Sequence, residues 1–336
     1  MATDEQRMKR HQRQNLVMVG TAVAILVSLN LSHPPRSATA APKAIINLIA
    51  PPPRPEAPRV EPRASYDQPA TPTQALKVYD SLRQIGYRLE AVLAGENQVP
   101  RLFLASLPRG MADLREVKVR KDLFVKTVLP LILQVNEEIM ADRLRLVRLR
   151  DLAQKGSLGR DDQRWLDDQA NQYGAEPGDF EALLARIDVV PPSLALAQAA
   201  EESGWGTSRF GLEGNALFGQ YSYADTDEPM MVPVKRDDDK SHTVRSFPTL
   251  LESVRAYAAN LNSHFAYRRY REARAQMRAK GKPLDGAALA VTLTRYSARG
   301  EDYTRALRAL ISVNDFLRLD WLSLKDPATG EDRPVI

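Results

Sequence analysis

The chain has 336 residues, 43% of them hydrophobic, so it is long enough to bury a sizeable core. It has no cysteine, which excludes disulfides and thiolate zinc sites, and its histidines, aspartates and glutamates show no metal-ligand spacing. We therefore expect no metal and no cofactor. The net charge of +5 is small, and basic and acidic residues are interleaved, as in residues 143–151. This pattern argues against nucleic-acid binding and allows a weak attraction to anionic polymers.

A basic flank followed by an apolar run opens the chain. Four lysines and arginines between Arg7 and Arg13 precede the apolar residues 16–29. A run of roughly 14–16 apolar residues is short for a full membrane span and long for a signal-peptide core. We expect an uncleaved single-pass anchor in the inner membrane, with the rest of the chain in the periplasm. The alternative is cleavage after Ala40, which would release the protein into the periplasm.

A proline-rich stretch follows this N-terminal segment. Residues 33–72 hold 11 of the 23 prolines of the chain, too many for a packed core. Such a segment is expected to be an extended, disordered linker that spans on the order of 100 Å.

Helical spacing of apolar residues begins at Thr73. A second, long helix is predicted over residues 123–152, with Pro130 inside it as a potential kink. Shorter helices are predicted at 161–173 and 179–186. We expect this part of the chain to pack and assign it no chemistry.

The helix predicted next has both of its ends encoded in the sequence. Pro191 and Pro192 suit a first turn, where a missing N–H costs nothing, and Gly204 suits the left-handed residue that ends a helix. Residues 194–200 are apolar or small on nearly every face, which indicates a helix buried all round.

Two adjacent glutamates lie in the last turn of this helix. Glu201 and Glu202 point about 100° apart, so one can be solvated while the other is held inside. Burial and the negative end of the helix dipole both raise the pKa of an inward carboxyl, as a general acid near neutral pH requires. Trp205 follows at once and offers an apolar wall or a face for a sugar ring. The alternative is that both glutamates merely close the helix on its solvated side.

The pattern changes to alternation after residue 219. Residues 231–235 and 243–247 predict a small β-hairpin. Helices then return, with Thr249 opening a capping box and Asp285 capping a further helix that continues to Tyr296. A last long helix contains Tyr303.

Three stretches of the chain resemble a known enzyme family. Residues 199–206 read Ala-Ala-Glu-Glu-Ser-Gly-Trp-Gly, and residues 215–219 read Asn-Ala-Leu-Phe-Gly. They resemble the signature of bacterial glucosaminidases of glycoside hydrolase family 73, which includes autolysins and flagellar peptidoglycan hydrolases. Residues 190–202 and 296–300 are most similar to the Bax-type branch. The resemblance runs from about residue 100 to residue 319.

The resemblance implies a mainly α fold: a lysozyme-like α+β glucosaminidase domain with a small β-hairpin, preceded by a helical segment. The expected organisation is a basic flank and anchor or signal peptide at 1–32, the linker at 33–72, the helical segment at 73–178, the catalytic domain at 179–323 and a tail at 324–336.

The resemblance also implies a set of site residues. Glu202 matches the general acid and Tyr296 a second catalytic position, while Tyr303 matches a recurring aromatic residue. We expect the substrate groove to be lined by Trp205, Asn215, Phe218, Tyr221 and Tyr303, with the Asn215 side chain also ordering its loop.

The second carboxylate of the family has no direct match. Many members carry a glutamate on the β-hairpin, but residues 232–236 read Val-Pro-Val-Lys-Arg. A two-carboxylate mechanism needs a partner about 5–9 Å from the acid. Glu228, or one of the aspartates 237–239 beginning with Asp237, is a candidate. Otherwise Glu202 would act with the acetamido group of the substrate or with water positioned by Tyr296, which leaves the stereochemical outcome open.

The activity implied is hydrolysis of the β-1,4 bond after N-acetylglucosamine in the glycan strands of peptidoglycan. One alternative is a lytic transglycosylase, which also uses a single helical glutamate. It fits the loop at 215–219 less well. The other is a non-catalytic wall-binding or scaffolding protein that has lost its second carboxylate.

Overall fold

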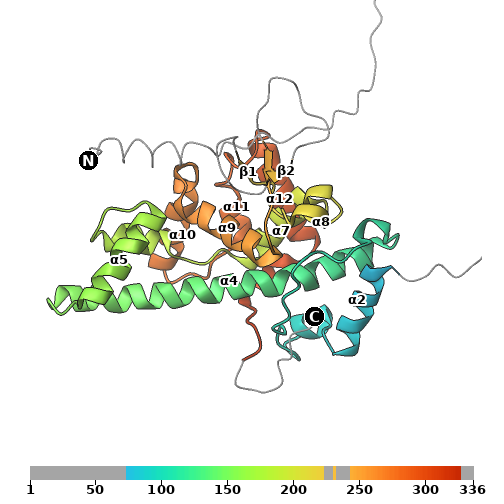
Figure 1. The fold of residues 1–336 in the computed structure, drawn as a ribbon, viewed down its shortest axis with the longest axis horizontal. Coiled ribbons are helices and arrows are strands. Elements are labelled where there is room, and N and C mark those ends of the chain that lie inside the picture. The colour runs from blue at the N-terminus through green and yellow to red at the C-terminus, as the bar shows by residue number, and fades with distance from the viewer. Residues whose placement is uncertain (1–72, 223–229, 232–242, 327–336) are drawn as a thin grey trace, which may run out of the picture. The chain divides into compact units, whose positions relative to one another are not determined.

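The computed structural model describes residues 73–222, 230–231 and 243–326. The expected anchor and linker lie outside these ranges, as do Glu228, Asp237 and most of the C-terminal tail (Figure 1). Among the residues that are described, no helix combines the length and the apolar character needed to cross a membrane.

The described part of the chain is mainly helical, as predicted. Its α-helices are α2 (Gln74–Gln84), α3 (Leu89–Leu93), α4 (Val117–Gln154), α5 (Arg160–Tyr173), α6 (Phe180–Arg186), α7 (Pro192–Ser203), α8 (Arg209–Gly214), α9 (Leu250–Ser263), α10 (Arg268–Ala279), α11 (Gly286–Ala290) and α12 (Glu301–Val313). Short 3-10 helices are η1 (Met111–Asp113), η2 (Phe265–Tyr267) and η3 (Phe316–Trp321).

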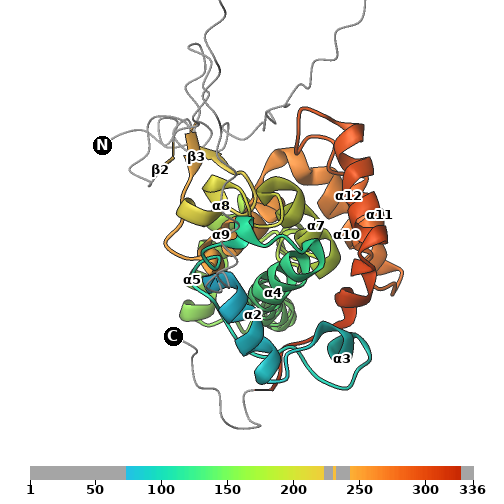
Figure 2. The same ribbon diagram turned by 90° about the vertical axis from the view of Figure 1, so that its right-hand side faces the viewer.

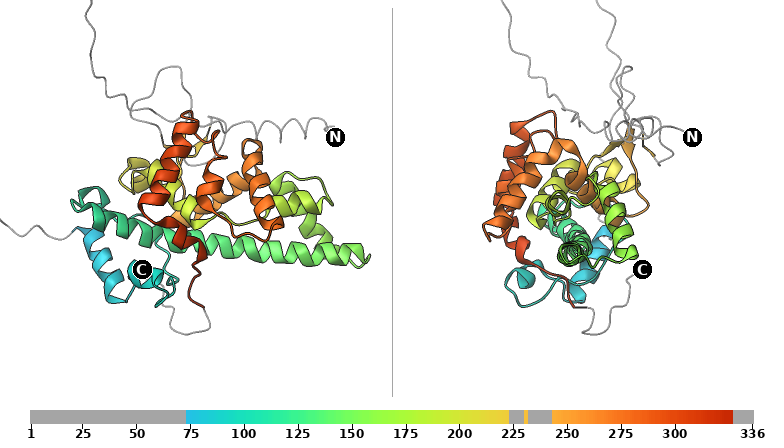
Figure 3. Two further views of the ribbon diagram at one scale, coloured as in Figure 1. Left: turned by 180° about the vertical axis from the view of Figure 1, so that it is seen from behind. Right: turned by 90° about the vertical axis from the view of Figure 1, so that its left-hand side faces the viewer.

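The long helix α4 forms the centre of this packing. Every residue from Leu123 to Leu133 is buried, because α2, α6, α7 and α9 all pack against the helix. In Figure 2, which looks nearly along α4, the other helices surround it, and Figure 3 shows the same arrangement from behind and from the other end. The predicted helix over 123–152 is confirmed, and it continues through Pro130.

One buried charge lies on this central helix. Lys126 donates to Asp122 over 2.7 Å, and its ammonium lies 4.9 Å from the centre of the Tyr79 ring. An opposite charge and an aromatic face together offset the desolvation of the ammonium. The contact between the Lys126 ammonium and the Tyr79 ring therefore connects α4 to α2.

A small antiparallel sheet is formed by β1 (Tyr221–Ser222), β2 (Met230–Met231) and β3 (Thr243–Arg245). Its strand order is β1-β3-β2, and Met231 pairs with Val244. The predicted pairing of these two segments is confirmed, and β3 ends two residues before the predicted end at residue 247. The sequence did not predict β1 as a third strand.

Two predicted helix caps are present. Thr249 accepts from the Glu252 N–H over 3.2 Å, and Asp285 accepts from the Ala288 N–H over 3.0 Å. The helix that Asp285 caps ends at Ala290 instead of reaching Tyr296. Thr292 donates its hydroxyl to the Leu289 carbonyl over 2.7 Å, a local bond that competes with helix continuation.

The predicted boundary near residue 178 does not divide the packing. Because α4 contacts both α7 and α9, the helical segment and the predicted catalytic domain share one core. The described residues from Thr73 onward belong to one compact unit.

Candidate active site

Helix α7 is fixed at both ends, as the sequence predicted. At its start, Asp320 accepts from the Ser193 N–H and from the Ser193 hydroxyl, each over 2.7 Å. Gly286 lies so close that a Cβ there would be 2.0 Å from the Ser193 Oγ, so only glycine lets α11 approach. At its end, Gly204 adopts a left-handed φ of 58°. The helix between is buried on every side from Pro192 to Ala200.

The carboxyl group of Glu202 lies at the end of this buried helix and is itself half-buried. Desolvation raises its pKa to about 7 from an ordinary value of 4.5. A hydrogen bond from Tyr303 and the charge of Arg299 act in the opposite direction, while the charge of Glu201 raises the pKa further. A carboxyl with this pKa holds a proton at neutral pH and can also release it.

Glu201 faces another way, as its position in the helix predicted. Its carboxylate lies 2.6 Å from the Arg299 guanidinium, and both side chains are partly exposed. One glutamate is thus committed to a solvated ion pair, and the other to an enclosed position.

The loop that carries the second motif lies directly against Glu202. Gly219 has a left-handed φ of 58°, and a Cβ there would lie 3.1 Å from the Glu202 Oε2. The Asn215 side chain donates to the carbonyls of Phe247 and Pro248 over 3.0 and 3.2 Å, which orders the loop. The backbone conformation therefore favours glycine at the end of the motif, and a side chain there would press on the Glu202 carboxyl.

Buried tyrosines form a layer behind the carboxyl. Tyr296 and Tyr303 stack in parallel with ring centres 5.5 Å apart, and Tyr267 lies 5.8 Å from Tyr296. The Tyr296 hydroxyl donates to the Phe218 carbonyl over 3.0 Å, one residue before Gly219. Burial, and then the nearby charge of Glu202, raise the pKa of both stacked tyrosines well above the ordinary value, so they stay protonated.

A buried amide, which the sequence analysis did not predict, connects Tyr303 to Tyr257 on α9. Gln198 accepts from the Tyr257 hydroxyl over 2.7 Å and donates to the Tyr303 oxygen over 3.0 Å. The available signal was a lone polar residue within the apolar stretch of residues 194–200, one turn before Glu202.

Three residues predicted to line the groove are buried instead, namely Asn215 at 7% exposed and two aromatic residues that are more deeply enclosed. Phe218 is 1% exposed, and its ring stacks on Tyr257 with centres 3.8 Å apart. Tyr303 is also 1% exposed and contacts Glu202 rather than solvent. The expectation that these two rings line a sugar groove is wrong, because both are enclosed by neighbouring helices.

Trp205 likewise takes a packing position. Its indole ring lies 5.7 Å from Phe124 in an edge contact and 6.1 Å from Phe316, and the Lys121 ammonium lies 4.5 Å from the ring centre. These neighbours belong to α4 and η3. Trp205 is itself only partly buried, and its role as a wall of the sugar groove stays a prediction.

The remaining predicted site residues lie where their side chains are not described. Tyr221 begins β1, but only its backbone is described. Glu228 and Asp237 lie outside the described residues. Across the described ranges, no group of three or more His, Asp or Glu side chains could hold a metal ion.

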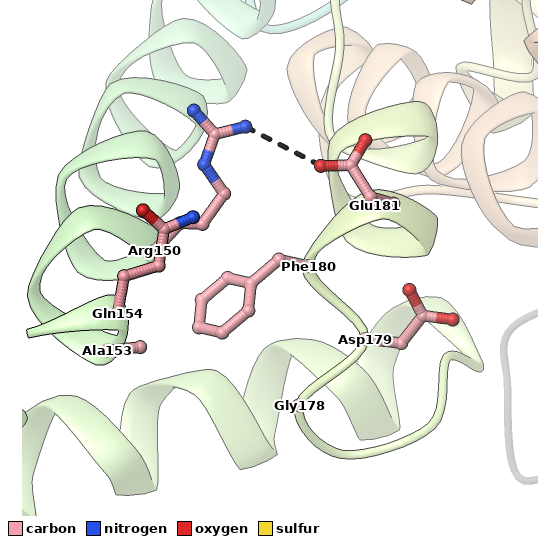
Figure 4. Close-up of a pocket in the computed structure, with 7 residues that line it drawn as sticks. All are labelled: Arg150, Ala153, Gln154, Gly178, Asp179, Phe180 and Glu181. Carbon is pink, nitrogen blue, oxygen red and sulfur yellow. Dashed lines mark ion pairs between the residues drawn. The ribbon is translucent and has the colours of Figure 1, made fainter. Parts of the chain in front are cut away.

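A pocket elsewhere in the molecule lies between the end of α4 and the start of α6 (Figure 4). Phe180 points into it from one side, and Arg150 and Glu181 form an ion pair of 3.5 Å across it. None of its lining residues belongs to the group around Glu202. We assign it no chemistry.

Comparison with known proteins agrees with this geometry. A family model, Glucosaminidase, described as mannosyl-glycoprotein endo-beta-N-acetylglucosaminidase, matches residues 179–316. Protein bax of Escherichia coli strain K12 is 32% identical over 204 residues, which cover 59% of this chain and 71% of that protein. The chain belongs to the Bax-type glucosaminidases. This membership makes the protein a glycoside hydrolase and confirms the resemblance carried by its sequence motifs.

Two solved structures have a more distant similarity to this glucosaminidase. The catalytic domain of the autolysin Auto from Listeria monocytogenes is 22% identical with a TM-score of 0.30, and covers 51% of this chain and 96% of its own. A C-terminally truncated glycoside hydrolase domain of FlgJ from Salmonella typhimurium is 24% identical with a TM-score of 0.29, and covers 44% of this chain and 96% of its own.

Proposed function

We propose that the protein hydrolyses peptidoglycan as an endo-β-N-acetylglucosaminidase, with Glu202 as the general acid. The observation that carries this proposal is the environment of the Glu202 carboxyl. It lies at the end of a buried helix and against Gly219, with a pKa of about 7. In its protonated form it would donate to the glycosidic oxygen as the bond to the leaving sugar breaks.

The second group of the reaction is proposed from the residues that connect the strands in the sequence. Glu201 is unsuitable, because its carboxylate is paired with Arg299 and directed away from Glu202. Glu228 and Asp237 remain the candidates for a second carboxylate. The alternative is attack by the acetamido oxygen of the substrate, or by a water bound to the Tyr296 oxygen. Tyr296 could accept from such a water, since its own hydrogen is donated to Phe218.

The substrate class rests on the relatives. The family model takes its description from enzymes that act on mannosyl-glycoproteins, whereas the curated relative is bacterial. The description of the family model names an endo-beta-N-acetylglucosaminidase, which supports a bond on the reducing side of N-acetylglucosamine. Peptidoglycan is the proposed substrate because it carries this bond in bacteria, and a high-mannose glycoprotein is the substrate against which to compare it.

The test is digestion of purified peptidoglycan followed by mass spectrometry of the reduced products. The proposal expects new reducing ends on N-acetylglucosamine, with Glu202→Gln inactive and Glu201→Gln active. Anhydro-muramic ends would identify a lytic transglycosylase, and the absence of products would favour a wall-binding protein. Cleavage of the glycoprotein alone would contradict the proposed substrate.

We also propose that the N-terminal residues anchor the enzyme in the inner membrane and that the rest lies in the periplasm. The support is the basic flank from Arg7 to Arg13, the apolar residues 16–29 and the proline-rich residues 33–72. The full chain should then fractionate with inner membranes, and external protease should release a soluble fragment by cutting between Pro34 and Thr73. A mature periplasmic protein starting at Ala41 would contradict the anchor.

A further inference from the structure

A single amide lies in the otherwise apolar core of the helix that carries Glu202. Gln198 is 0% exposed and is the only polar side chain between Leu194 and Ala200. A buried amide is costly unless its donors and acceptor are bonded. Here the oxygen is bonded to Tyr257 and the nitrogen to Tyr303, so the amide joins α9 to α12 through α7.

The direction of these bonds follows from the chemistry of the groups. The Tyr257 hydroxyl faces the amide oxygen and donates to it. This leaves the amide nitrogen facing Tyr303, and an amide nitrogen can only donate. The Tyr303 oxygen is therefore an acceptor on that side, and the hydrogen of its own hydroxyl must point elsewhere. A hydrogen bond from the Tyr303 side chain lowers the pKa of Glu202, which makes the Glu202 carboxyl the acceptor for that hydrogen.

We propose that Gln198 is a positioning residue that holds the Tyr303 hydroxyl as a donor to Glu202. The bond stabilises the carboxylate that remains after the acid has given up its proton. The proposal rests on the proposed function, because it assumes that Glu202 is the acid. It assigns Gln198 no contact with substrate.

The other groups that face Glu202 show why this bond matters. Burial raises the Glu202 pKa most, and Glu201 on the same helix raises it further. Arg299, from the turn before α12, lowers the pKa, but the hydrogen bond from Tyr303 lowers it more. Tyr267 and Tyr296 are the remaining titratable groups facing it in the described part of the chain, and both stay neutral. The hydrogen bond from Tyr303 is thus the largest effect that lowers the Glu202 pKa against the rise caused by burial.

The experiment measures the titration of Glu202 directly and through activity. Full-length protein with glutamate labelled by carbon-13 at the side-chain carboxyl is titrated by NMR, and Glu202→Gln identifies the resonance. In parallel, kcat/KM on soluble peptidoglycan fragments is measured against pH. Activity should fall as pH rises through the Glu202 pKa, because the acid must be protonated.

Three variants test the chain of bonds. Tyr303→Phe should raise the Glu202 pKa, and move the alkaline limb of activity upward, by about one pH unit. Gln198→Met keeps the volume but removes both amide bonds, so it should produce part of the same rise. Tyr257→Phe, which frees the amide to turn over, should produce a smaller rise. The double variant of Gln198 and Tyr303 should titrate no higher than Tyr303→Phe alone, because the bonds act in series.

The control is Ser193→Ala, which removes a buried hydroxyl from the other end of the same helix and should leave the Glu202 pKa unchanged. Wild-type titration in folded Gln198→Met and Tyr257→Phe would overturn the proposal, as would wild-type titration in Tyr303→Phe. If Gln198→Met does not fold, Tyr257→Phe decides, because it keeps the ring stacked on Phe218. If the wild-type enzyme cleaves no glycan, the proposed function fails, but the NMR titration still tests Gln198.

Discussion

Replacing Glu202 by glutamine should abolish hydrolysis and at the same time stabilise the fold in alkaline solution. The carboxyl has a pKa of about 7 in the folded protein and about 4.5 when unfolded. Below the lower value both states are protonated, so the group favours neither. Between pH 4.5 and 7 the unfolded chain ionises this carboxyl while the folded protein keeps it protonated, so stability falls across that window and stays at the lower level above it. The difference amounts to about 2–3 kcal/mol above pH 8, after allowance for partial exposure.

Urea denaturation at pH 5 and pH 9 measures this effect. The variant should match the wild type at pH 5 within about 1 kcal/mol and exceed it by about 2–3 kcal/mol at pH 9. Glu201→Gln is the matched control, because it loses only a partly exposed ion pair and should change stability by less than about 1 kcal/mol. An equal stability difference at both pH values would refute the raised pKa. Retained hydrolysis in Glu202→Gln would refute the role as acid.

Two further substitutions probe the surroundings of this carboxyl, and a third probes the start of α7. Gly219→Ala should cost about 1–2 kcal/mol of stability, because alanine is strained in the left-handed backbone conformation of this residue. It should also reduce turnover by displacing the Glu202 carboxyl. Thermal unfolding and muropeptide release measure the two effects, and wild-type turnover would contradict the contact between residue 219 and Glu202. Tyr296→Phe should lower turnover roughly tenfold and cost about 1–2 kcal/mol of stability, because the buried Phe218 carbonyl loses its donor; near-normal turnover would leave Tyr296 a structural role alone. Asp320→Ala should destabilise the protein by roughly 2–4 kcal/mol, because it leaves donors at the start of α7 unpaired, whereas Asp320→Asn should recover part of that loss in chemical denaturation.

The sequence best predicted those structural features that are determined by residues close together in the chain. Helix α7 begins after Pro191 and ends at Gly204 because proline and glycine act on their own backbone. Glu201 lies in a partly exposed ion pair and Glu202 in an enclosed position because adjacent residues of a helix point about 100° apart. The buried face of α4 follows from the spacing of its apolar side chains.

Contacts between segments that are far apart in the chain could not be predicted from local sequence patterns. Phe218 and Tyr303 are aromatic residues close in space to the acid, and an aromatic residue near a sugar site can line the groove or support it from behind. Only the packing of α9 and α12 decides, and it buries both rings. The partner of Gln198 on α9 lies 59 residues away in the chain, so no local pattern connects the two.

The family model begins at residue 179, after α4 has ended, yet α4 supplies the centre of the packing beneath α7 and α9. A fragment cut at that boundary would expose the apolar faces that these helices turn toward α4, so it should not fold by itself. Residues of α4 far from Glu202 contribute to stability without contacting the groups that take part in proton transfer. Substitutions in the two regions should therefore have nearly additive effects. The thermal tolerance of such an enzyme can then change through α4 while the chemistry at Glu202 stays the same.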